Sequence, residues 1–155
     1  SLSLSLSLSL SLSFSLSSPS FLSSSEALFP KVVKMHAALA SQRIDADAID
    51  AAMLASLGAD RASLENDYKI IRFKPFDPVS KRSEATVQPK EGHPFKVVKG
   101  APQVILHIVH NEGDVQEEVN SKISEFASRG YRTLGVAYCA EPQENEAQER
   151  WTYEG

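Results

Sequence analysis

The stretch EATVQPKEGHPFKVVKG, residues 84–100, decides the fold of this chain. Two runs of apolar and β-branched residues flank the polar segment PKEGHP, which holds the Pro and Gly residues typical of a turn. We therefore predict two strands joined as a β-hairpin. The preceding run YKIIRFKPF, residues 68–76, alternates enough for a further strand, which Pro78 should end because proline cannot take part in a central strand ladder.

Helical patterns surround these strands, and we predict helices over residues 31–42, 45–58, 101–110 and 114–130. In the first helix an apolar stripe is expected from Val32, Met35, His36 and Leu39. In the second, the N-terminus should be capped by Asp45 and Asp47, and Gly58 stands where a residue just beyond the C-cap belongs.

A last strand pattern covers residues 131–139, a polar connection follows, and WTYEG at 151–155 reads as the start of another strand. Helices thus alternate with strands that form hairpins. We predict an α+β fold, in which a mainly antiparallel sheet is flanked by helices.

Composition limits the classes of function. A chain of 155 residues suits one domain, and its net charge of −4 argues against a general nucleic-acid binder. One cysteine, Cys139, excludes an internal disulfide and suits a reducing compartment. No apolar run approaches the roughly 18 residues that span a bilayer, so we expect no membrane contact by this segment.

The first 25 residues contain only Ser, Leu, Phe and Pro, and they begin with a strict Ser-Leu alternation. All four residue types can be encoded with pyrimidines in the first two codon positions, and a CT repeat read in frame gives Ser-Leu-Ser-Leu. Our hypothesis is that residues 1–25 are a translated pyrimidine tract. The predicted domain is therefore residues 26–155.

Familiar catalytic motifs are absent: the sequence holds no GxxxxGK(S/T), GxGxxG, GxSxG or HExxH. His107 and His110 have a spacing that metals can use, but without further ligands a helix surface is favoured, and we predict no metal site. The acidic run from Glu141 to Glu149 is interpreted as a solvated loop.

Two stretches together favour a nucleotide. In VVKGAPQVIL, residues 97–106, a strand ends at Lys99, Gly100 allows close approach of the backbone, and a helix opens, so the ammonium should lie beside free helix N–H groups. In FKPFDPVSKR, residues 73–82, aromatic rings precede cations. Adjacent strands could therefore hold Phe76, Lys81 and Lys99 around one cleft.

The segments DAIDAAML, FKPFDPVSKR, VVKGAPQVIL and ASRGYRTLGVAY occur in an order and spacing that resembles the nucleotide-binding domain of P-type ATPases. Within that family, DAIDAA together with FDPVSKR resembles the plasma-membrane proton pumps. The resemblance covers about residues 32–155. It implies a cytoplasmic ATP-binding domain of a plasma-membrane pump, with that pump's phosphorylation and actuator domains as partners.

The resemblance assigns roles to particular positions. Phe76 matches the aromatic residue that stacks on adenine, Lys81 a nearby lysine on the nucleotide, and Lys99 the lysine deep in the adenine pocket. Asp50 matches an acidic residue on the adenine side, and Arg132 an arginine that reaches the phosphates. From the residues alone, Phe76 could equally be core, Asp50 a first-turn helix carboxylate, and Arg132 a solvent-facing strand residue.

The same resemblance limits the expected activity. P-type pumps phosphorylate an aspartate in DKTGT and use TGD and GDGxND segments, and none of these occurs in the chain. We therefore expect ATP binding without hydrolysis, no catalytic residue, and Mg²⁺ only in an intact pump. The open alternatives are an interaction module without a nucleotide site and the equivalent domain of a pump for another cation; a free-standing phosphatase is disfavoured.

Overall fold

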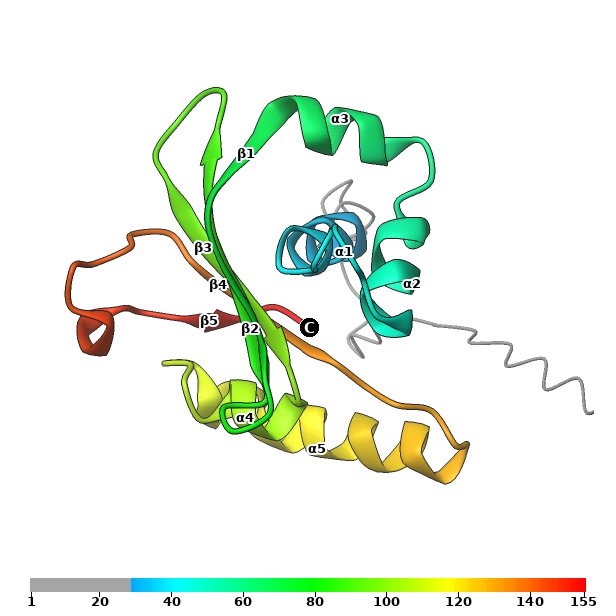
Figure 1. Ribbon diagram of the computed structural model, residues 1–155. Coiled ribbons are helices and arrows are strands. Elements are labelled where there is room, and N and C mark those ends of the chain that lie inside the picture. The colour runs from blue at the N-terminus through cyan, green and yellow to red at the C-terminus, as the bar shows by residue number, and fades with distance from the viewer. Residues whose placement is uncertain (1–28) are drawn as a thin grey trace, which may run out of the picture.

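The computed structural model describes residues 29–155, so the hypothesis about residues 1–25 falls outside the described residues. A single antiparallel sheet forms the centre (Figure 1). Helices α1, α2 and α3 cover one face, and α4 and α5 lie at the lower end of the sheet in this view. Within the described part of the chain, no helix combines the length and apolar character needed to cross a membrane.

The sheet has five strands in the order β1-β2-β3-β4-β5, and every neighbouring pair is antiparallel. The strands are β1 Tyr68–Asp77, β2 Arg82–Pro89, β3 Phe95–Gly100, β4 Gly135–Cys139 and β5 Thr152–Tyr153. The predicted hairpin, the end of β1 before Pro78 and the antiparallel α+β class are therefore confirmed.

One strand prediction was too long. The strand expected over residues 131–139 begins only at Gly135, because its pairing with β3 starts where Gly135 faces Gly100. Arg132 therefore lies in the connection that precedes β4 and not in a strand.

The helices are α1 Phe29–Leu39, α2 Ala48–Ser56, α3 Asp60–Asp67, α4 Pro102–Leu106 and α5 Glu112–Ser128. The sequence patterns did not reveal α3, because Leu64 is its only buried residue and no apolar stripe marks it. At α2, Asp47 is the N-cap and accepts a hydrogen bond from Asp50 N at 2.8 Å, as expected. Asp45 does not cap the helix; its φ is 53°, in the left-handed region.

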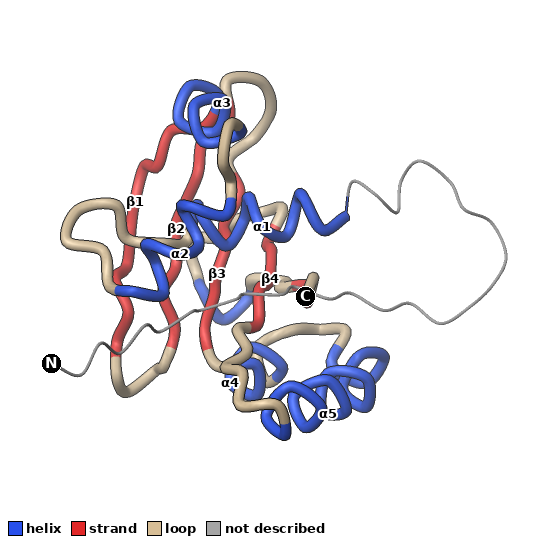
Figure 2. Tube along the Cα trace, turned by 90° about the vertical axis from the view of Figure 1, so that its right-hand side faces the viewer, coloured by secondary structure: helices blue, strands red, loops and turns tan. Residues whose placement is uncertain are grey.

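The buried face of α1 also differs from the predicted stripe. His36 and Leu39 are buried, but Val32 is 37% exposed, and its neighbour Val33 is buried instead. The helix packs both on the sheet and against α2, with Val33 beside Met53. Because α1 is covered on two sides, a single stripe does not describe its contacts (Figure 2).

The core lies on both faces of the sheet. Adjacent residues in a strand point to opposite faces, so Val97 joins the cluster beneath α1 to α3, whereas Val98 joins a second cluster with Ile105 of α4. Trp151, just before β5, packs into the second cluster. This division decides which side of the sheet each polar residue of β3 can reach.

Candidate functional site

The centre of the candidate site is a buried ion pair between β3 and α2. Lys99 Nζ donates to Asp50 Oδ1 at 2.5 Å, and the two side chains are only 5% and 9% exposed. The prediction that this ammonium lies beside the N–H groups of α4 was wrong. Lys99 follows Val98 in the strand, so its side chain leaves on the face of α1 to α3, whereas α4 packs with Val98 on the opposite face.

Local hydrogen bonds hold Asp50 in place. Asp47 caps α2 and fixes its first turn, which points the Asp50 carboxylate toward the connection between α1 and α2. There the second carboxylate oxygen accepts a hydrogen bond from Gln42 N at 2.7 Å. Ser83 of β2 donates to Ala40 O at 2.7 Å and ties the same connection to the sheet.

The predicted list of site residues did not include Gln42, Ser83 or their neighbour Arg43. Arg43 has two guanidinium nitrogens, Nε and Nη2, that are buried without an acceptor among residues 29–155. No local motif marks these residues, since they are brought to Asp50 by the path of the α1–α2 connection. Ser83 donates to Ala40 across a separation of 43 positions. A single sequence gives no signal for side-chain hydrogen bonds that join residues so far apart.

Gly100 makes the close backbone approach that was predicted, and its partner is Lys81. A Cβ atom at Gly100 would clash with the Lys81 carbonyl oxygen and would lie 2.9 Å from Arg82 Cβ. Ala101 N also donates to Lys81 O, at 3.3 Å. The absence of a side chain at Gly100 therefore lets β3 lie against the end of the β1–β2 hairpin.

The hairpin turn is ordered by Asp77. Its carboxylate accepts hydrogen bonds from Ser80 N at 2.9 Å and Val79 N at 3.2 Å, and these bonds lower the pKa of Asp77. The turn closes with Lys81 N donating to Asp77 O at 2.7 Å, and Lys81 has a φ of 52°, which is uncommon for a residue with a side chain. The turn thus places the Lys81 side chain in solvent at a fixed point.

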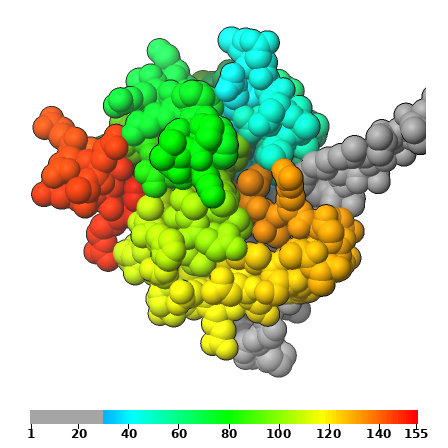
Figure 3. Space-filling model, turned by 60° about the horizontal axis from the view of Figure 1, so that its bottom comes forward, coloured from blue at the N-terminus to red at the C-terminus, as the bar shows by residue number. Residues whose placement is uncertain are grey.

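The predicted site residues gather at one end of the sheet. Register pairs Gly100 with both Arg82 and Gly135, and Asp77 with Arg82, so the β1–β2 hairpin and the connection that carries Arg132 reach the same end. Figure 3 shows this end, where the green hairpin, the yellow-green segment after β3 and the orange connection meet.

Their side chains nevertheless divide into two groups. Lys99 and Asp50 are buried in contact with each other, whereas Lys81 and Arg132 are exposed and Phe76 is 54% exposed. Two hollows of roughly 500 Å³ on the described surface are lined by other residues. The expectation of one cleft shared by Phe76, Lys81 and Lys99 therefore needs correction: strand alternation and the Asp50 contact draw the Lys99 ammonium inward.

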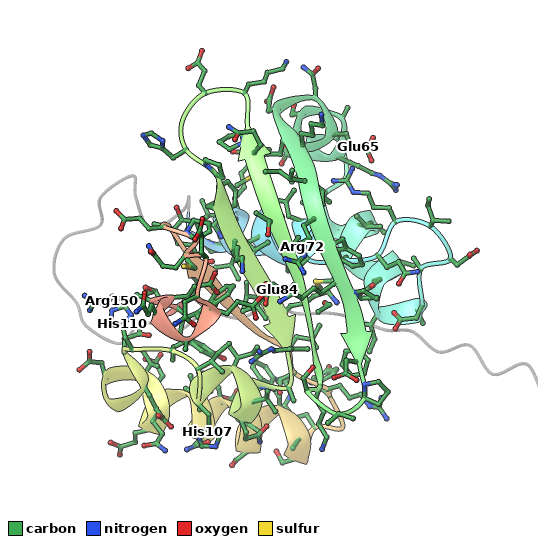
Figure 4. All side chains as sticks on the ribbon, turned by 60° about the vertical axis from the view of Figure 1, so that its left-hand side comes forward. Glu65, Arg72, Glu84, His107, His110 and Arg150 are labelled. Carbon is green, nitrogen blue, oxygen red and sulfur yellow. The ribbon has the colours of Figure 1, made fainter. Side chains whose placement is uncertain are left out.

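The two histidines of the α4 region have separate partners. His107 Nδ1 lies 3.3 Å from Glu112 Oε1, and His110 Nδ1 lies 2.7 Å from the Trp151 carbonyl oxygen. Figure 4 shows the two rings apart. Among residues 29–155 no group of three His, Cys, Asp or Glu side chains is placed to hold a metal ion.

The acidic run after β4 is not simply a solvated loop. Glu149 has a side chain that is 2% exposed and lies 2.7 Å from Lys96 Nζ, while Glu146 lies 2.5 Å from Lys74 Nζ. Glu84 of β2, near the centre of this face in Figure 4, lies 3.2 Å from Lys96 Nζ. Burial opposes the charge on Lys96, but the carboxylates of Glu149 and Glu84 outweigh it and raise the pKa of Lys96. These ion pairs hold the acidic run against the sheet.

The relatives of the chain are named as ATPases. One, named "Putative cation-transporting ATPase MJ1226" from Methanocaldococcus jannaschii, is 47% identical over 108 residues, which is 68% of this chain. The plasma membrane ATPase of Neurospora crassa is 43% identical over 116 residues, or 70% of this chain, and plasma membrane ATPase 1 of Saccharomyces cerevisiae is 41% identical over 120 residues, or 72%. In each case the match spans 13% of the relative's own length.

A family model described as "P-type ATPase, cytoplasmic domain N" matches residues 34–154, which include every element from the middle of α1 to β5. The match covers both the Asp50–Lys99 pair and the β1–β2 hairpin. The chain therefore belongs to the P-type ATPase family, as a segment of its cytoplasmic domain N.

Proposed function

We propose that the chain binds ATP at the end of the sheet that carries the Asp50–Lys99 pair. The observation that supports this most is the pair itself, a salt bridge buried on both sides at 2.5 Å. Burying two charges costs free energy that a salt bridge often fails to recover, so stabilisation of the fold alone gives a weak reason for this pair, and a ligand-binding role gives a second one. It also lies at the end where the hairpin presents Phe76 and Lys81.

The chemistry of the pair suits adenine. A carboxylate can accept a hydrogen bond from the exocyclic amino group of adenine, and an ammonium can donate to a ring nitrogen. Guanine presents a carbonyl oxygen where adenine has its amino group, and that oxygen would face the Asp50 carboxylate. The proposed site should therefore prefer ATP to GTP.

The exposed residues suit the rest of the nucleotide. Phe76 offers about half of its surface to solvent and can stack on the base. Lys81 and Arg132 are exposed cations at the same end, and each can pair with phosphate oxygens. In this arrangement the base stacks on Phe76 with its edge toward the Asp50–Lys99 pair, and the triphosphate lies outward. Because the two side chains of the pair are only 5% and 9% exposed, the pair has to become more accessible when ATP binds.

In a whole pump, the task proposed for this domain is positioning. It would hold ATP and present the γ-phosphate to an aspartate outside this chain, which is catalysis by proximity that depends on hinge closure. The names of the fungal relatives favour a plasma-membrane ATPase. The resemblance of DAIDAA and FDPVSKR to the plasma-membrane proton pumps favours protons as the transported ion. The phosphorylation and actuator domains would be the partners, and Mg²⁺ would be supplied with ATP. The archaeal relative, named for cation transport, keeps a pump for another cation as the second candidate.

The test is a titration of ATP and GTP into the isotopically labelled full chain, followed by amide chemical shifts. We expect changes around Asp50, Phe76 and Lys99 with ATP and smaller ones with GTP. Phe76→Ala should weaken ATP binding, whereas Ile71→Ala should not; Ile71 is a matched control because it is an apolar residue of the same strand with 56% exposure. Shifts that are absent, or equal for both nucleotides, would refute the proposal and favour an interaction module.

A further inference from the structure

A hollow of roughly 500 Å³ lies away from the proposed nucleotide end, between α1, the β2–β3 hairpin and the final residues of the chain. It is bordered by Phe95 at the start of β3, whereas Lys99 and Gly100 occupy the other end of the same strand. Figure 2 shows α1 crossing the sheet over β3 and β4, and Val32 and His36 of this helix line the hollow.

The hollow is lined by aromatic rings that fix one another. His36 stacks on Tyr138 with ring centroids 5.1 Å apart and planes at 9°. Phe95 lies 5.4 Å from Tyr138 and 5.5 Å from His36, and Tyr68 meets Phe95 edge-on at 6.1 Å. Rings packed in this way are held in position before any ligand arrives: His36 and Phe95 are buried, and Tyr68 and Tyr138 keep part of their surface exposed at the wall of the hollow.

The charge in the hollow is negative. Among its described lining residues, Glu91 and Glu154 are carboxylates, His36 and His93 are imidazoles, and none is lysine or arginine. Glu154 Oε2 lies 2.7 Å from His36 Nδ1, and its side chain is 14% exposed, so one carboxylate is anchored at the wall. Glu91 is exposed on the hairpin. Burial, followed by the negative charge of Glu154, raises the pKa of Tyr138.

Aromatic faces combined with carboxylates are the surroundings that organic cations prefer, since a ring face attracts a cation and a carboxylate adds Coulombic attraction. Metal ions need closer ligands, and no metal-binding group of three side chains occurs among residues 29–155. A nucleotide is disfavoured because its phosphates would meet Glu91 and Glu154. The hollow and the proposed nucleotide end therefore attract opposite charges.

We propose that the hollow formed by His36, Tyr68, Phe95 and Tyr138, with Glu91 and Glu154, binds an organic cation through an ammonium or guanidinium group. The cation could be a small amine or a basic side chain of a partner. The inference does not depend on ATP binding, because the two sites share no residue.

The experiment titrates choline chloride into the labelled full chain at constant ionic strength and follows amide shifts. The neutral isostere of choline, with carbon in place of nitrogen, is titrated in parallel. We expect shifts around Glu91, Phe95 and Tyr138 with choline only. Glu91→Gln should weaken choline binding about twofold to fivefold, which is the usual worth of one exposed charge pair. Glu117→Gln on the exposed face of α5 is the matched control and should change nothing.

A second arm uses a short glycine peptide with one lysine. Tighter binding by the peptide would assign the site to a basic side chain of a partner, and tighter binding by choline would assign it to a free amine. Equal shifts with choline and its neutral isostere would contradict the proposal, as would the absence of shifts from both cations. Shifts centred on Lys99 would contradict it as well.

Discussion

Replacing Lys99 by Met tests the buried ion pair most sharply. The variant keeps most of the length of the side chain and removes its charge. It leaves Asp50, 9% exposed at its side chain, with Gln42 N as its remaining hydrogen-bond donor among residues 29–155. Removing one partner of a buried pair costs about 3–5 kcal/mol, because the other charge stays buried without compensation. Domains of this size are stable by about 5–15 kcal/mol, so the variant should still fold.

Urea unfolding measures the effect. With a denaturant slope near 1.5 kcal/mol/M, a loss of about 3 kcal/mol lowers the unfolding midpoint by about 2 M. Lys31→Met is the matched control, since Lys31 pairs with Asp60 on the surface, with side chains 61% and 53% exposed, and should cost less than about 1 kcal/mol.

The double variant Asp50→Asn with Lys99→Met completes the cycle. If the pair is coupled as the geometry indicates, the double variant should be more stable than the sum of the two single losses predicts, by about 2 kcal/mol or more. Additive losses, or a cost for Lys99→Met as small as that of Lys31→Met, would refute the reasoning.

Three other changes have defined outcomes. Gly100→Ala should destabilise the chain by roughly 1–3 kcal/mol in urea unfolding, because the added Cβ would clash with the Lys81 carbonyl oxygen. The control Gly113→Ala, in helix α5 with open space around it, should be neutral or stabilising by about 0.5–1 kcal/mol. Equal effects of the two variants would contradict the close approach of Gly100 to Lys81. Burial raises the pKa of Tyr153 to about 12, above the usual value near 10, so its contribution to stability is complete below about pH 10 and is lost as pH rises from there to about 12. Tyr153→Phe should remove that part of the alkaline loss in unfolding followed against pH, and tyrosinate absorbance should show a phenol that titrates near pH 12 in the unaltered chain and is lost in the variant. Lys96→Met should cost about 3 kcal/mol, because it leaves the buried Glu149 without its cation and Glu84 with only Lys74, 3.4 Å away. Lys74→Met, at a side chain 37% exposed, should cost less than about 1 kcal/mol, because Lys96 still neutralises Glu84; similar midpoints for the two variants would argue against this ion-pair cluster.

The parts of the fold that could be predicted depend on local chemistry. The β2–β3 hairpin follows from a turn segment between two apolar runs, and the start and end of α2 follow from the capping Asp47 and from Gly58, whose φ is 53°. Each of these features is determined by residues that are close together in the sequence. The antiparallel sheet then follows from hairpins that join consecutive strands.

The parts that could not be predicted depend on contacts across the chain. Helix α3 has one buried residue, Leu64, and so no periodic pattern. The direction of Lys99 is decided by which face of the sheet α4 covers, and Glu149 is buried because Lys96 lies opposite it. The spacing of apolar and polar residues along the sequence predicts none of these contacts.

The candidate site was predicted in part. The resemblance assigned Asp50 and Lys99 to one site, and Gly100 was expected to allow a close backbone approach beside Lys99. The structure brings their segments to one end of the sheet. The pairing of Lys99 with Asp50 was not expected from the residues alone. The aromatic hollow around His36 could not have been found in advance, because its lining residues come from α1, from strands β1 to β4, from the β2–β3 turn and from Glu154.

The central claim is that the adenine base of ATP lies against Phe76. Intermolecular NOEs between the ring protons of adenine and the ring protons of Phe76, recorded on the labelled chain with ATP, would measure that position directly. We predict NOEs to Phe76 together with a shift of the Lys99 ammonium signal. NOEs to other aromatic residues, such as Tyr138 in the hollow at the opposite end of β3, with Phe76 and Lys99 unaffected, would contradict the account.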